Sequence, residues 1–77
     1  MFKKLSLKKR IDRCKRNIAH LEQKRSRSQA ALVEAILTHA TPNDEDVDFF
    51  NRFTNLINSE RSNMHILMKE LEELKKK

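Results

Sequence analysis

Apolar side chains recur at alternating intervals of four and three residues in two long segments, and this spacing constrains the fold more than any other feature. In the first segment the seam positions are Leu7, Ile11, Cys14, Ile18 and Leu21, resuming at Leu32 and Ala35. In the second they are Val47, Phe50, Thr54, Ile57, Arg61, Met64, Met68 and Leu71. Such intervals put side chains on one face of an α-helix, as in a coiled coil. The chain therefore contains two long amphipathic helices.

The segment HATPNDEDVD, residues 39–48, separates the two repeats. Thr41 is suited to cap a new helix, and Pro42 suits its first position, where a missing N–H costs nothing. Proline also keeps Thr41 out of the helical region, which ends the first helix near His39 or Ala40. The acidic residues that follow favour the positive end of a helix dipole. We predict an all-α, antiparallel two-helix hairpin: one helix over about 5–39, a turn at 40–43 and a second helix over about 44–75.

A chain of 77 residues forms a single domain, here 1–77, with a limited core that needs additional support. One cysteine excludes an internal disulfide, and Cys14 on the seam is interpreted as a core residue. We therefore expect a homodimer that forms a four-helix bundle. The residues assigned to its core and dimer seam are Ile11, Ile18, Leu21, Leu32, Phe50, Ile57, Met64, Met68 and Leu71.

Two polar runs interrupt the repeats: EQKRSRSQ at 22–29 and NSERSN at 58–63. A turn centred near Asn43 would place Arg25 opposite Arg61 and Ser28 opposite Asn58, in one polar layer. Such a layer can fix register and oligomeric state. The alternatives are a docking site for an acidic or phosphate-bearing partner, and a charge reversal by phosphorylation of Ser26 or Ser28.

The net charge of +6 is unevenly distributed. Residues 1–27 hold eleven basic and two acidic side chains, whereas residues 28–60 hold one basic and six acidic ones. A hairpin thus has a basic end, where its termini meet, and an acidic hinge, and two copies lying antiparallel would set unlike charges side by side. The candidate binding residues of the basic end are Lys8, Lys9, Arg10, Arg13, Arg16 and Lys75.

Clustered cations can form a simple solvated charged face, or they can bind an acidic protein partner or, as the alternative, nucleic acid through its phosphates. No Tyr or Trp is present to stack on bases. Phe2, Leu5 and Leu7 among lysines form only a short amphipathic segment, so a membrane partner is not expected. The basic start lacks a following apolar stretch, which predicts no signal peptide and a cytoplasmic protein.

No pattern typical of catalysis or metal binding occurs. His20, His39 and His65 are widely spaced, and the acids at 44–48 lack the spacing and glycine of a calcium loop. We therefore expect neither an enzyme nor a cofactor. The leading prediction is a non-enzymatic protein-interaction module, a small regulator or adaptor that acts through its helix faces and its basic end.

The predicted helix number and lengths resemble the Rop family of plasmid copy-number regulators, which are dimeric helical hairpins that bind RNA. This resemblance implies the alternative function, a nucleic-acid-binding regulator that prefers RNA to DNA, and it assigns no residue. The segment TPNDEDVDFFNRFTNLI is also similar to the hinge and second helix of a family of small sporulation phosphatases. Those proteins carry Ser-Gln-Glu-Leu-Asp where this chain has FNRFT at 50–54, so the missing acid implies that the activity is absent.

Overall fold

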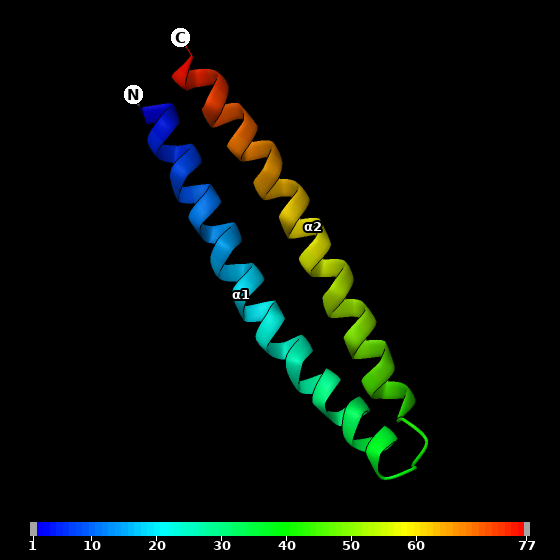
Figure 1. Ribbon diagram of the computed structural model, residues 1–77. Helices are drawn as coiled ribbons and strands as arrows, with labels where there is room; N and C mark the ends of the chain where they lie inside the picture. Colours follow the sequence, from blue (N-terminus) through cyan, green and yellow to red (C-terminus); the bar gives the residue numbers. More distant parts are fainter. Residues whose placement is uncertain (1, 77) are drawn as a thin grey trace.

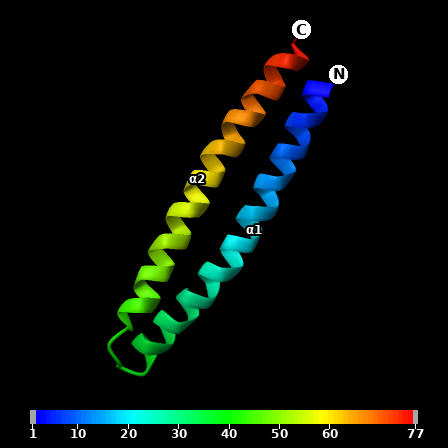
Figure 2. The same cartoon turned by 180° about the vertical axis from the view of Figure 1, so that it is seen from behind.

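A computed structural model describes residues 2–76 as two helices packed side by side in a hairpin (Figure 1). Helix α1 spans Phe2–Leu37 and α2 spans Asp44–Lys75, compared with predicted ranges of 5–39 and 44–75. The rod measures 59 × 16 × 14 Å. The view from behind also shows both termini at one end and the hinge at the other (Figure 2). The two helices are antiparallel, as the sequence predicts.

Helix α1 ends earlier than predicted because the backbone reverses at His39, which adopts a left-handed conformation with φ 58°. The Ala40 N–H donates to the Ala35 carbonyl at 2.8 Å, and the His39 N–H donates to the Ile36 carbonyl at 3.2 Å. This pair of bonds is the Schellman arrangement, in which glycine usually occupies the left-handed position. A chain without glycine uses histidine there, a residue that tolerates this conformation better than most.

Helix α2 is capped by Asn43, so the assignment of the cap to Thr41 is wrong. The Asn43 side-chain oxygen accepts a hydrogen bond from the Glu45 N–H at 3.0 Å, and the Asn43 backbone is extended. Pro42 consequently precedes the cap instead of occupying the first helical turn. Asp44, Glu45 and Asp46 fill that turn, where their charge favours the helix dipole.

The core of the hairpin is narrow. Six apolar side chains are buried between the helices: Leu7, Ile11, Cys14, Ile18, Ile57 and Leu67. Of the other predicted seam residues, five are half-buried: Leu21, Leu32, Phe50, Met64 and Leu71. Met68, which we predicted on the seam, is 39% exposed on the flank of the hairpin.

The seam of α2 differs from the predicted one in its second half. Arg61 and Met68 lie outside it, whereas Glu60 is half-buried and Leu67 is buried. The residues facing α1 recur at intervals of three and four through Phe53, Ile57, Glu60, Met64, Leu67, Leu71 and Leu74. This stripe is favoured because it buries Leu67 and half-buries Leu74 while half-burying one carboxylate, whereas the predicted stripe would have buried Arg61.

Candidate functional site

The predicted polar layer is not formed as expected. Arg61 donates from Nη2 to Oε1 of Glu22 at 2.8 Å, and Arg25 lies 6.0 Å from the centre of the Phe50 ring, in a cation–π geometry. Ser28 is buried, whereas Asn58 is exposed. Arg25 therefore does not face Arg61, and the pairing of Ser28 with Asn58 is also wrong.

The physical reason is the position of the turn. Because α1 ends at Leu37 and α2 begins at Asp44, the midpoint of the connection lies between Ala40 and Thr41 instead of near Asn43. Each residue of α1 then faces a residue of α2 about five positions nearer the hinge than predicted, an axial difference of about 7.5 Å at 1.5 Å per residue. The two polar runs meet only where Glu22 pairs with Arg61.

The Glu22–Arg61 ion pair is the only one that the described residues form. The two side chains are 42% and 53% exposed, so solvent screens the attraction. An exposed pair of this kind contributes about 0–1 kcal/mol. Every cation of the basic end is therefore without an intrachain carboxylate partner among residues 2–76.

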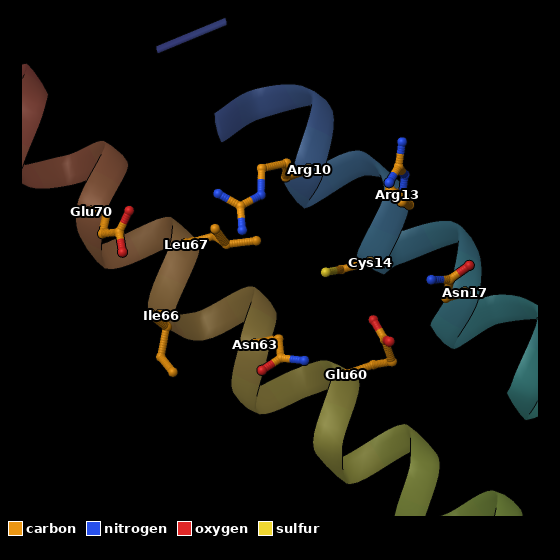
Figure 3. A pocket seen from close by; sticks show the side chains of 9 residues that line it. All are labelled: Arg10, Arg13, Cys14, Asn17, Glu60, Asn63, Ile66, Leu67 and Glu70. Carbon is orange, nitrogen blue, oxygen red and sulfur yellow. The ribbon is translucent and has the colours of Figure 1, made fainter. Parts of the chain in front are cut away.

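A groove of about 400 Å³, lined by both polar and apolar side chains, lies between the helices in the half of the rod nearer the termini. Figure 3 shows the Arg10 guanidinium and the Glu60 carboxylate pointing into the space between α1 and α2, on either side of the Cys14 sulfur. Cys14 and Leu67 are its buried residues, and Ile66 stands at its edge. Its lining side chains are Arg10, Arg13, Cys14, Asn17, Glu60, Asn63, Ile66, Leu67 and Glu70.

The Cys14 thiol is held in its protonated form. Burial raises its pKa, and Glu60, as hydrogen-bond partner and negative charge, raises it further, while Arg10 and Arg13 lower it by a smaller effect. A thiol in this setting is a poor nucleophile at neutral pH. The arrangement is that of a core residue rather than a reactive one.

The six predicted residues of the basic end, Lys8, Lys9, Arg10, Arg13, Arg16 and Lys75, are all exposed. Lys9, Arg13 and Arg16 line an open hollow on the outer surface of α1 together with Asp12 and Lys15. Lys9, Arg10 and Arg13 also border a second hollow, which contains the exposed Phe2 and Leu5. Leu7 does not belong to this surface because it is buried in the core.

Sequence reasoning did not assign four polar residues of the groove to a site: Asn17, Glu60, Asn63 and Glu70. A signal for the α2 members was present, because Phe49, Phe53, Leu56, Glu60, Asn63, Leu67 and Glu70 follow one another at intervals of four and three. The repeat is obscured in the sequence because its second half is mostly polar.

The described residues hold no group of three or more His, Cys, Asp or Glu side chains that could bind a metal ion. No helix within residues 2–76 is long and apolar enough to cross a membrane. No protein family, curated protein or solved structure matches the chain.

Proposed function

We propose that this protein is a non-enzymatic interaction module: a helical hairpin that dimerises into a four-helix bundle and offers its basic end to a partner with negative charge. The observation that carries the proposal is the apolar surface left uncovered around the hinge half of the rod. Six large apolar side chains are exposed there: Val33, Ile36, Leu37, Val47, Phe49 and Leu56.

Two arguments support self-association. Domains below about 70–80 residues rarely gain more than about 3–5 kcal/mol from one core, and this core has six buried apolar side chains. Apolar side chains gathered around one half of a narrow rod also leave water-exposed surface that a second rod can cover. Four helices enclose a central core that two helices do not have.

The charge distribution supports the choice of partner. The cations of α1 from Lys3 to Arg27 form no ion pair within the described chain. Their attraction is therefore directed outward, towards a partner that supplies negative charge. An acidic protein surface meets this requirement without any base recognition.

The test of the dimer is the mass in solution, measured by light scattering from about 5 to 200 µM. The monomer has a mass of 9.2 kDa, so a dimer would give about 18 kDa. The melting temperature should also rise with protein concentration, because association stabilises the folded state by mass action. A mass of one chain throughout this range would contradict the proposal.

A second candidate function is nucleic-acid binding. Lys9, Arg13 and Arg16 follow one another at intervals of four and three on the outward side of α1, where side chains one turn apart are about 5–6 Å from each other. Phe2 in the neighbouring hollow provides a ring on which an unpaired base could stack. Such an interface would bind phosphates without sequence preference.

Fluorescence anisotropy with single-stranded RNA and with duplex DNA, each at 50 and 200 mM salt, tests this second candidate. We expect binding at low salt that weakens at least tenfold at high salt, and an Arg13→Gln/Arg16→Gln variant that loses most of it. Arg52→Gln near the hinge is the matched control and should leave binding unchanged. Absence of binding at 50 mM salt would refute this function.

A further inference from the structure

One stripe of α2 combines an apolar half with a grooved half. Phe49, Phe53 and Leu56 form the apolar half near the hinge, and the rings of Phe49 and Phe53 stack with centroids 6.1 Å apart. The same intervals of four and three continue into Glu60, Asn63, Leu67 and Glu70, which belong to the groove. Residues at these intervals share one face of a helix, so both halves lie on the same flank of the rod.

Phe53 of the apolar half is half-buried against α1, whereas Phe49 and Leu56 lack a cover within the described chain. Phe49 is 37% exposed and Leu56 is 45% exposed, although both belong to the side-chain types that proteins usually bury. At the other end of the stripe, Ile66 is 57% exposed at the edge of the groove, and buried Leu67 lines it. The half of the stripe near the hinge thus has projecting apolar side chains, and the half near the termini has a groove that is partly lined by apolar side chains.

We infer that two copies of this chain pack antiparallel along this stripe, with Phe49, Phe53 and Leu56 of each copy covering the groove of the other. Helix α2 spans Asp44–Lys75, so full antiparallel overlap of two α2 helices pairs residues whose numbers add up to about 119. Leu56 then lies opposite Asn63, Phe53 opposite Ile66, and Phe49 opposite Glu70. These partners are all groove residues, which means that full overlap brings each apolar half onto a groove.

Charge favours the same orientation. Asp44, Glu45 and Asp46 at the start of α2 come to lie beside Lys75 and Lys76 of the second copy, at its basic end. A parallel pair would instead set acidic hinge against acidic hinge and lysines against lysines, which costs free energy in both places. The occupant of the groove is therefore a second copy of this chain rather than an unrelated helix.

Twofold symmetry follows from this arrangement. Each contact occurs twice, because Leu56 of the first copy meets the groove of the second and Leu56 of the second copy meets the groove of the first. An isologous interface of this kind closes on itself, so the assembly stops at two chains and four helices. The polar groove residues Glu60 and Asn63 then lie near the centre of the interface, where they can set the pairing of the two chains.

Cysteine cross-linking in a Cys14→Ala background tests the inference, which rests on the proposed dimer. Leu56→Cys and Asn63→Cys are prepared as separate proteins, mixed in equal amounts and oxidised. The mixture should give several times more cross-linked dimer than either protein alone. In the mixed dimer the cysteine at position 56 of one chain lies opposite the cysteine at position 63 of the other. In a dimer of a single variant, the two identical positions lie about 10 Å apart along the axis. Non-reducing electrophoresis measures the yield.

The matched control is the pair Asn51→Cys and Met68→Cys, whose numbers also add up to 119 but which lie on the flank that carries Arg61. This pair should remain uncross-linked. Stronger cross-linking of Leu56→Cys alone would show a parallel dimer, and stronger cross-linking of the control pair would show the opposite flank; each result overturns the inference. No cross-linking in a protein of dimeric mass also overturns it, whereas a monomeric mass removes the proposed dimer as well.

An independent measurement avoids disulfide formation. A spin label at Asp44→Cys, again in the Cys14→Ala background, should show a separation of about 48 Å between the two copies, the length of a 32-residue helix. A parallel dimer would bring the two labels to within the width of the bundle. A short distance would therefore overturn the antiparallel arrangement while leaving the proposed dimer intact.

Discussion

Glu60 is the residue whose replacement tests the described packing most directly. It is a half-buried carboxylate on the α2 seam, one turn from Ile57 and one turn from Met64, and it helps to raise the pKa of the Cys14 thiol. Replacing it with leucine extends an apolar seam. We expect the Glu60→Leu variant to be more stable than the natural chain.

The magnitude follows from the burial. Full burial of a leucine side chain stabilises a protein by about 1.5–3 kcal/mol, and a half-buried position gives about half of that. Removing a carboxylate from a partly dehydrated site adds a smaller gain. Loss of the interaction between Glu60 and the Cys14 thiol costs about 0.5 kcal/mol at most, because a thiol is a weak donor. The net gain of about 1 kcal/mol corresponds to a rise in melting temperature of about 4–8 °C for a domain of this size.

Thermal melts followed by circular dichroism measure this change, with both proteins at the same concentration because association would itself shift the midpoint. The matched control is Arg61→Leu at the next position. Arg61 is exposed and loses only a solvent-screened ion pair, so its melting temperature should change by a few degrees at most. A Glu60→Leu variant that melts several degrees below the natural chain, or an Arg61→Leu variant that shows the larger gain, would refute the packing of α2 described above.

Three further predictions concern the hinge and the thiol. His39→Gly should raise stability by about 0.5–1 kcal/mol in urea titrations, because glycine adopts the left-handed conformation without steric cost. Asn43→Ala should lower stability by about 1 kcal/mol in the same assay, whereas Thr41→Ala should be close to neutral; the reverse order would restore Thr41 as the cap. The contribution of Cys14 to stability should be complete below the ordinary thiol pKa of 9.0 and decline above it, since the raised pKa of the folded state disfavours the thiolate. Its alkylation by iodoacetamide should need a higher pH than that of a free thiol, and Glu60→Gln should lower that pH; an unshifted profile would contradict the hydrogen bond.

The sequence predicts the hairpin because its two strongest signals are local. The intervals from Leu7 to Ile18 describe one face of α1 without ambiguity, and Pro42 with the acids after it places a helix start. Both the all-helical fold and the packing of its two helices are confirmed. Neither signal requires knowledge of what the helix packs against.

The register and the α2 seam could not be obtained in the same way. The register of the hairpin depends on where α1 ends, and α1 ends at Leu37 because His39, just beyond it, adopts a left-handed conformation. Glycine usually marks such a position in a sequence, but this chain has no glycine. Helix α2 carries overlapping stripes, one through Arg61 and Met68 and another through Glu60 and Leu67, with Ile57 and Met64 common to both. Only packing against α1 decides between the two stripes. Because the predicted register differed from the observed one by about five residues, we predicted a polar layer that the structure does not contain.

The polar run at 22–29 is not half of a polar layer in the structure. Arg25 lies against Phe50, and Ser28 is buried. The outer side of α1 carries no large exposed apolar side chain from Lys9 to Arg27, whereas Phe49 and Leu56 of α2 are exposed. In the proposed dimer, the stripe of α2 would meet the second copy, and α1 would present cations that form no ion pair within the described chain. In the proposed antiparallel dimer the two basic ends would lie at opposite ends of the rod, each beside the acidic hinge of the other copy. A polyanion long enough to contact both basic ends would bind the dimer better than a single chain, and by linkage it would also favour the dimer.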